Sequence, residues 1–337
     1  MVSIKDVAKL AGVSVMTASR ALNGGGAVSA EARRRVLQAS QKLNYRPNLN
    51  ARSLRVKETR LIGLLLPDIE NPLFASLAKH VEAAAGECGY SVMLGNTWEN
   101  PAREAEYLEL MLARQMDAIA VVPVSGDNAL RFAACPAPLV VLDRRLEAAE
   151  ELASVTVDNR EIGALAARHL LSLGHRNFAC IAGPETVPVF VDRLEGFRDE
   201  LVGAGARLRH IARVESVGNP GHGAEAAEHL LSETPLPCAL FCANDVIALG
   251  AIRAAHRLGL DVPGDVSVVG VDGIPAGELS APPLTTVRQP VREMAEAGVE
   301  LLLAMLHPEG EEARPERGGL RPELLLREST GKFRSEK

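Results

Sequence analysis

Aromatic residues are scarce in this sequence, at 3% of its 337 residues, although hydrophobic residues of all kinds reach 47%. The buried cores must therefore be built mainly from aliphatic side chains. Cysteine is also rare, and it shows neither a metal-ligand spacing nor the even count of a disulfide framework. The five cysteines are Cys88, Cys135, Cys180, Cys238 and Cys242. This usage predicts reduced thiols in a cytoplasmic protein with no metal site.

Motifs for membrane insertion, export and catalysis are absent as well. No apolar run reaches the length of a bilayer span, and the charged, amphipathic N-terminus does not have the pattern of a signal peptide. The sequence holds no Gly-Lys-Ser/Thr phosphate loop, no Gly-x-Ser-x-Gly elbow and no paired-His metal motif. It therefore predicts a protein with no membrane association, no cofactor and no enzymatic activity. A sugar-modifying α/β enzyme is a remote alternative. Asp143 and Asp272 would form its acid/base pair, but no nucleophile or set of metal ligands accompanies them.

Positive charge is concentrated at the N-terminus. Residues 1–60 contain twelve Lys or Arg residues and three acidic residues, a balance of +9. Because the whole chain carries −6, residues 61–337 carry −15. A basic head on an acidic body is typical of a protein whose first domain binds nucleic acid.

The basic segment contains the pattern of a helix-turn-helix. Two short helices are predicted at 2–11 and 15–23, joined by a three-residue turn that contains glycine. Ser14 is a good N-cap for the second helix, and Ser3 and Asp6 stand at the spacing of a capping box in the first. In such a motif the second helix enters the major groove of DNA.

The second helix supplies the predicted base contacts, and a third helix from Ser29 to about Leu43 completes an all-α head. Val15 and Met16 occupy the base-reading positions; because both are apolar, they can contact thymine methyl groups but cannot form a bidentate base contact. Arg20 is the candidate for a hydrogen bond to guanine. The other predicted DNA-binding residues are Thr17, Ser19 and Asn23, which suit phosphates, together with Ser14, Tyr45, Arg52 and Leu54.

A helical octet at 48–55 lies between two linkers and is too short to be stable alone. It is basic and carries Leu54, so we expect it to fold on DNA beside a second copy of the chain. There Leu54 would enter a minor-groove base step and kink the duplex. The alternative is an ordinary linker in which Leu54 packs on the body.

From residue 61 onward, aliphatic strands alternate with amphipathic helices, and the alternation starts again near residue 154. Continuous aliphatic strands separated by helices predict parallel sheets covered on both faces. Two such halves in tandem imply two lobes with a cleft between them. Ligands of these sheets bind at the carboxyl ends of the strands.

Polar residues follow several of these predicted strands. Asp143-Arg144, Asn244-Asp245 and Asp272 each come directly after a strand, and Arg193 stands near the start of a helix predicted from Asp192 to Gly203. Carboxylates, an amide and a guanidinium around a cleft are the groups that recognise sugar hydroxyls. Each residue could instead cap the next helix, and for Asn244-Asp245 we expect one of the two to do so.

The sequence resembles the lactose-repressor/galactose-repressor family of bacterial transcription regulators. The resemblance is carried by Ile4-Lys5-Asp6-Val7-Ala8, Ala11-Gly12-Val13-Ser14, Thr17-Ala18-Ser19-Arg20-Ala21-Leu22-Asn23, Asn44-Tyr45-Arg46-Pro47-Asn48 and Ala51-Arg52-Ser53-Leu54, and it continues through almost the entire chain. It implies a homodimer that binds a near-palindromic double-stranded DNA operator under the control of a small-molecule effector. An exported solute-binding protein shares the two-lobed body but would need a signal peptide and no basic head.

The resemblance also implies a division into domains. It predicts a helix-turn-helix domain at 1–46, a hinge helix and linker at 47–59, and an effector-binding and dimerisation domain at 60–337. The last has a periplasmic-binding-protein-like fold, with an N-subdomain at about 60–157 plus 290–320 and a C-subdomain at about 158–287 plus 321–330.

The effector contacts implied by the resemblance are Asp143, Arg193, Asn244, Asp272 and Gln289, to which we add Phe74 and Arg144. The segment at 95–100 is similar to the purine-repressor branch, which stacks its base between aromatic rings. Here only Phe74 offers a ring, and residues 187–189 are apolar, so the sequence favours a sugar, sugar acid or polyol over a purine. Arg144 would suit a carboxylate or phosphate on that sugar, or it could pair with Asp143.

Overall fold

The computed structural model describes residues 2–23, 28–45, 58–308 and 316–333. The chain forms two compact units, Met1–Thr59 and Arg60–Lys337, and each is described by itself below. The predicted hinge octet, with Arg52 and Leu54, falls in residues 46–57 and lies outside the described residues.

The first unit contains the three predicted helices: α1 (Ile4–Ala11), α2 (Val15–Asn23) and α3 (Ala30–Lys42). The capping box of α1 is confirmed. The Ser3 N–H donates to Asp6 Oδ2 at 2.9 Å, and the Ser3 side chain accepts from the backbone N–H of Asp6. Ser14 caps α2 by accepting the Thr17 N–H at 3.0 Å, and Gly12 between the helices has φ +63°, which suits glycine. The helices bury a small aliphatic core of Val7, Ala8, Ala11, Ala18, Ala21, Val36 and Ala39.

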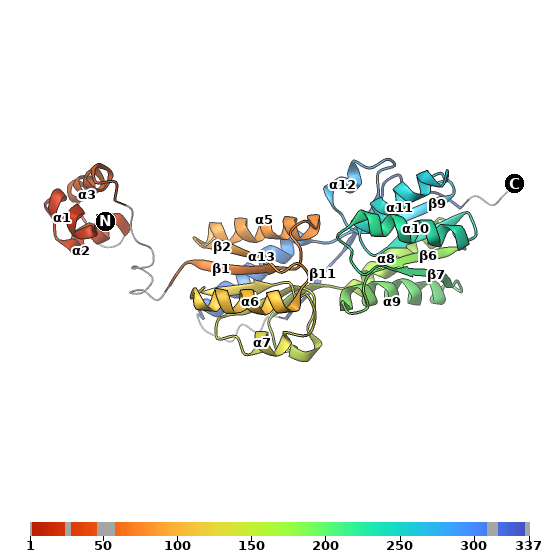
Figure 1. Ribbon diagram of the computed structural model, residues 1–337, viewed down its shortest axis with the longest axis horizontal. Helices are drawn as coiled ribbons and strands as arrows, with labels where there is room; N and C mark the ends of the chain where they lie inside the picture. The colour runs from red at the N-terminus through yellow and green to blue at the C-terminus, as the bar shows by residue number, and fades with distance from the viewer. Residues whose placement is uncertain (1, 24–27, 46–57, 309–315, 334–337) are drawn as a thin grey trace. The chain divides into compact units, whose positions relative to one another are not determined.

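The first sheet of the body has the strand order β11-β5-β4-β3-β1-β2, and all of these strands are parallel to their neighbours. Its strands are β1 (Leu61–Leu66), β2 (Ser91–Asn96), β3 (Ala118–Val121), β4 (Leu139–Asp143), β5 (Ser154–Val157) and β11 (Glu316–Leu320). The helices α5 (Pro72–Glu87) and α13 (Val291–Leu306) cover one face, while α6 (Pro101–Ala113) and α7 (Ala129–Ala133) cover the other (Figure 1). A short 3-10 helix, η1 (Glu147–Ala149), follows β4.

The second sheet has the order β12-β10-β9-β8-β6-β7 and is parallel except for β12. Its strands are β6 (Phe178–Ala182), β7 (Leu208–Arg213), β8 (Cys238–Cys242), β9 (Val266–Asp272), β10 (Thr285–Arg288) and β12 (Glu323–Leu325). The helices α8 (Asn159–Ser172) and α9 (Pro188–Gly203) pack together, as do α10 (Pro220–Glu233) and α11 (Asp245–Arg257). A single-turn helix, α12 (Pro275–Glu278), follows β9.

The chain passes from one sheet to the other after β5, after β10 and after β11. The two sheets therefore form two lobes whose carboxyl-end loops approach each other. Asp68, after β1, comes so close to Gly218, after β7, that a Cβ on Gly218 would stand 3.1 Å from Asp68 Oδ2. Side chains in the loops after strands of either sheet can therefore contact the same ligand.

Several boundaries differ from the sequence-based expectation. The helix expected to start at Asp192 begins at Pro188, because proline suits the first turn, where its missing N–H costs no hydrogen bond. Arg193 therefore lies in the second turn of α9 instead of opening the helix. The strands β10 and β11 were not predicted, since prolines flank the first and glycines interrupt the second.

Candidate functional site

Three side chains of α2 that were predicted to read DNA are exposed on the head. Val15 is 43% exposed and Met16 is 63% exposed, and Arg20 is also exposed, whereas Ala18 and Ala21 on the opposite face of α2 are buried. Large apolar side chains that face water on a nine-residue helix are available to a partner with its own apolar groups.

The polar side chains among the predicted DNA-binding residues differ in how exposed they are. Ser14 is exposed and Thr17 half-buried, and their hydroxyl oxygens lie 2.9 Å apart in a hydrogen bond. Ser19 is half-buried, as is Tyr45, which packs against the head core. The side chain of Asn23 lies outside the described residues.

In the body, α9 places Arg193 at the centre of a buried polar cluster. Its Nε donates to Asn159 Oδ1 at 2.8 Å, and its Nη1 donates to the carbonyl oxygen of Ala243 at 2.9 Å. The same Nη1 lies 3.8 Å from Asp272 Oδ1, which also accepts from Gln289 Nε2 at 2.9 Å. The structure therefore brings together Arg193, Asp272 and Gln289 from α9, β9 and the residue after β10.

The other lobe contributes Asp143, Arg144 and Phe74. Arg144 donates from Nη1 to the carbonyl oxygens of Pro123 (2.8 Å) and Val124 (3.2 Å), its Nε lies 3.9 Å from Asp143 Oδ2, and its guanidinium carbon stands 5.6 Å from the centre of the Phe74 ring. Burial lowers the pKa of Arg144, and Asp143 opposes that shift. The pairing with Asp143, one of the two roles left open by the sequence, is thus present in the structure.

Asn244 has the helix-capping role that the sequence left open. Its Oδ1 accepts the Ile247 N–H at 2.9 Å at the start of α11, and its Nδ2 donates to the carbonyl oxygen of Val217 at 3.1 Å. Its neighbour Asp245 accepts from the N–H groups of Gly273 and Ile274, both at 2.8 Å. Asp245 therefore holds the turn that follows Asp272.

Neither Asp143 nor Asp272 caps a helix. Both have positive φ values, +64° at Asp143 and +115° at Asp272, which are unfavourable for residues with a side chain. Such strain persists only where the surrounding structure enforces it, and it is commonly found at ligand sites.

Two aspartates of this cluster ionise near neutral pH. Burial raises the pKa of Asp272 to about 6; Arg193 and Gln289 counteract that rise, while Asp143 adds to it. Burial, followed by the charge of Asp272, raises the pKa of Asp245 to about 7. A small change in the nearby charge therefore alters the protonation of both carboxyl groups.

Sequence reasoning missed two supporting residues. Asn159, at the start of α8, orients Arg193 through its side-chain oxygen. Glu104 of α6 is fully buried and accepts from the Val124 N–H (2.7 Å) and Asn128 Nδ2 (2.8 Å), which fixes the loop that Arg144 contacts. The Asp158-Asn159 pair at a strand-to-helix junction was a usable signal, whereas nothing local distinguishes Glu104 from an exposed helix residue.

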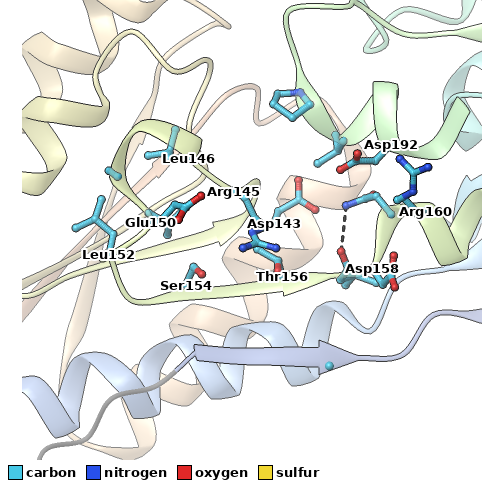
Figure 2. A pocket seen from close by; sticks show the side chains of 17 residues that line it. Asp143, Arg145, Leu146, Glu150, Leu152, Ser154, Thr156, Asp158, Arg160 and Asp192 are labelled. Atoms are coloured by element: carbon cyan, nitrogen blue, oxygen red, sulfur yellow. Dashed lines mark hydrogen bonds between the residues drawn. The ribbon is translucent and has the colours of Figure 1, made fainter. Parts of the chain in front are cut away.

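A cavity of about 690 Å³ opens beside Asp143 (Figure 2). In this view Asp143 lies between Arg145 and Glu150 on one side and Arg160 and Asp192 on the other. The cavity is lined by the ends of β4 and β5 and by the first turns of α8 and α9, so both lobes contribute. A smaller cavity of about 260 Å³ is lined in part by Asp272 and Gln289.

Comparison with known proteins assigns the two parts of the chain. Residues 3–48 match bacterial regulatory proteins of the lacI family, and residues 167–330 match a periplasmic binding protein-like domain. The chain is also 39% identical to the ribose operon repressor of Halalkalibacterium halodurans over 309 residues, which cover 91% of each protein. The chain belongs to the lacI family of bacterial regulatory proteins. As a lacI-family member it is a DNA-binding transcriptional regulator, which confirms the function and fold class inferred from the sequence.

Other members of the lacI family are similarly close. The HTH-type transcriptional repressor PurR of Pasteurella multocida is 37% identical over 335 residues, which cover 98% of each protein. The solved structure of the lac repressor dimer bound to operator and the anti-inducer ONPF aligns over 98% of this chain and 99% of that chain, with a TM-score of 0.88 and 28% identity. The ribose operon repressor and PurR are both named as repressors.

No described helix is long and apolar enough to cross a membrane. Within the same residues, no group of three or more His, Cys, Asp or Glu side chains is arranged to hold a metal ion.

Proposed function

We propose that this lacI-family regulator is a repressor that binds a near-palindromic operator as a homodimer, and that a sugar, sugar acid or polyol bound between its lobes controls operator affinity. The observation that carries the effector class is the buried cluster of Asp143, Arg193, Asp272 and Gln289. It combines carboxylate, guanidinium and amide groups from both lobes, the set that suits vicinal hydroxyls.

The aromatic side chains near the cluster support a sugar over a purine. The structure adds a second ring, Phe190, to the one expected from the sequence, Phe74. Arg144 stands over the face of Phe74, and Arg193 stands 5.5 Å from the centre of the Phe190 ring. A purine held by stacking needs free ring faces, and each of these rings already has a guanidinium over one face. A purine effector remains the second candidate because the PurR repressor of Pasteurella multocida is 37% identical along almost the whole chain.

The dimer and the operator are supported by the solved lac repressor, which is a dimer bound to operator. Two heads related by two-fold symmetry read two half-sites of inverted orientation, which is why the site is near-palindromic. The predicted DNA contacts on α2 and the predicted octet with Leu54 serve as the output of the switch.

The control mechanism is linkage between ligand binding and lobe orientation. An effector that contacts Asp143 on one lobe and Asp272 on the other favours one relative orientation of the lobes. That orientation sets the spacing of the two octets in the dimer and hence operator affinity. Whether the effector releases or recruits the repressor depends on which orientation suits the operator.

The test uses the full-length protein in two steps. Selection from a pool of random DNA duplexes should enrich a near-palindromic site, and a thermal-shift screen of sugars, sugar acids, polyols and purine bases should identify a ligand that stabilises the protein by mass action. The ligand should then change affinity for the selected site. Failure to enrich any site, or steady turnover of a sugar, would contradict the proposal; a response to purine bases alone would establish the second candidate.

A further inference from the structure

Glu104 of α6 is a buried carboxylate that the proposed function does not use. The residue is 0% exposed, and both of its carboxylate oxygens accept hydrogen bonds. Oε1 accepts the Val124 N–H at 2.7 Å, and Oε2 accepts from Asn128 Nδ2 at 2.8 Å. Asn128 also donates to the carbonyl oxygen of Pro101 at 2.7 Å. Glu104 therefore holds the loop at 122–128, which joins β3 to α7, at two points.

The same loop fixes the guanidinium of Arg144. The Val124 N–H donates to Glu104, while the Val124 carbonyl oxygen accepts from Arg144 Nη1 at 3.2 Å. The carbonyl oxygen of Pro123 accepts from the same nitrogen at 2.8 Å. Within the described residues the Arg144 side chain forms no further hydrogen bond, and its buried Nε stands 3.9 Å from Asp143 Oδ2. The direction of this guanidinium is thus set by a loop that Glu104 holds.

The loop and Arg144 both face a cavity between the lobes. This cavity, of about 200 Å³, is lined by residues 123–126 of the loop, by Arg144 and by Pro188 of α9 in the other lobe. Because Arg144 is hydrogen-bonded to the loop, a displacement of the loop would move the guanidinium and change the shape of the cavity together.

The contacts of Glu104 require an ionised carboxylate. Both of its oxygens face donors, so a glutamine would set its amide nitrogen against either the Val124 N–H or Asn128 Nδ2. Burial raises the pKa of Glu104, while the hydrogen bonds from Asn128 and Val124 and the charge of Arg144 lower it. Burial in turn lowers the pKa of Arg144, and Asp143 and, more weakly, Glu104 oppose that shift. Glu104 and Arg144 are therefore coupled through the loop and through their charges.

We infer that Glu104 is a positioning residue for the effector site: through the N–H and carbonyl groups of Val124 it sets the direction of the Arg144 guanidinium, and thereby the affinity for the effector. Glu104 contacts no ligand in this arrangement, because both of its oxygens are occupied by the loop. The inference rests on the proposed function, since the direction of Arg144 matters to affinity only where Arg144 meets the effector.

The first test needs no effector. In the full-length protein made with isotope-labelled arginine, the NMR signal of the Arg144 Nε–H group is the one that disappears in Arg144→Met. Exchange of this buried proton with solvent requires the guanidinium to leave the loop. Glu104→Gln should accelerate the exchange by about tenfold or more, because it removes a buried hydrogen bond to a charged group. Glu106→Gln, at an exposed position of the same helix, is the matched control and should leave the rate unchanged.

An unchanged exchange rate in folded Glu104→Gln would overturn the positioning role. Asn128→Ala is a milder variant that decides the question if Glu104→Gln does not fold. It removes the donor to Glu104 Oε2 and keeps the bond to Val124, so it should accelerate the exchange by a smaller factor. An unchanged rate in this variant would then overturn the role.

The second test is a double-mutant cycle on effector binding. A thermal-shift panel of D-ribose, ribitol, D-gluconate and hypoxanthine identifies a binder, and isothermal titration of that compound gives Kd. Glu104→Gln and Arg144→Met should each raise Kd by about tenfold or more. The double variant should raise Kd no further than Arg144→Met does, because Glu104 acts through Arg144.

The outcomes separate this inference from the proposed function. Effects on Kd that multiply in the double variant, or an unchanged Kd in Glu104→Gln, would overturn the link from Glu104 to the effector and leave the ligand-controlled regulator intact. A panel in which no compound binds would contradict the proposed effector class. The exchange rates would still decide whether Glu104 positions Arg144.

Discussion

The head and the body of this protein place their functional side chains in opposite environments. In the head, Val15 and Met16 are apolar and exposed, and they are neighbours on one short helix. In the body, Asp143, Arg193 and Asp272 are charged and buried, and they come from positions up to 129 residues apart. Each region thus inverts the usual preference of its residue types.

The difference reflects what each region binds. DNA is a large polyanion that approaches from solvent, so the head needs positive charge and a few exposed contacts, and its residues need no partners beforehand. The ligand-binding groups of the body are buried, and a buried charge is costly unless it is paired. The body therefore pairs its buried charges, Arg144 with Asp143 and Arg193 with Asp272.

The largest difference between head and body should be in the salt dependence of their binding. Raising monovalent salt from about 50 to 200 mM should weaken operator binding by about 1,000-fold or more, because the basic head displaces counterions from phosphates. Effector affinity should change little, since the cleft groups are buried and salt screens buried charges weakly. Fluorescence anisotropy for DNA and calorimetry for the effector measure both; a flat DNA profile would argue against the basic head as the DNA-binding surface.

Loss of Arg193 should affect the body alone. Arg193→Ala leaves Asp272 and Asn159 without their shared partner, so effector affinity should fall by more than about 100-fold and the free energy of unfolding by about 3 kcal/mol. Operator binding without effector should persist at temperatures below the lowered melting point. Arg209→Ala, which removes an exposed arginine from β7, is the matched control. A normal effector response in Arg193→Ala would refute the role of Arg193 as a ligand.

Acid should act on the two regions with opposite sign. The pKa of Asp245 in the body is raised from 3.8 to about 7 by burial, so the stability this group contributes is fully present below pH 3.8 and is lost as pH rises through 7. In the head, a hydrogen bond from the Ser3 N–H lowers the pKa of Asp6, so its contribution is present above the ordinary pKa and is lost as pH falls.

The measurement is the free energy of unfolding of the body between pH 4 and 8 in the wild type and in Asp245→Asn, which keeps an acceptor for the Gly273 and Ile274 N–H groups. Relative to the variant, the wild type should gain up to about 1.4 kcal/mol for each pH unit lowered across this window. Parallel pH profiles for the two proteins would show that Asp245 ionises outside this window.

Local patterns were sufficient where neighbours in the sequence are also neighbours in space. The bounds of α2, the Ser14 cap and the capping box of α1 depend on residues within four positions of each other, and all were predicted. The aliphatic strands were predicted for the same reason. The start of α9 was misplaced because Val187-Pro188 is compatible with either a loop or a first helical turn.

What the sequence alone determined is the head, the alternation of strands and helices, the family, and the polar residues that follow the strands. Only the tertiary structure decided how those polar residues are used. Arg144 is held by carbonyl oxygens of the loop after β3, and Arg193 is shared by Asn159 and Asp272. The buried Glu104 accepts from the Val124 N–H in that loop. Hydrogen-bond partners depend on directions and distances between segments far apart in the chain, which no local pattern encodes. The buried Arg144 Nε and Gln289 Oε1, which have no hydrogen-bond partner among the described residues, could therefore be identified only in the folded protein.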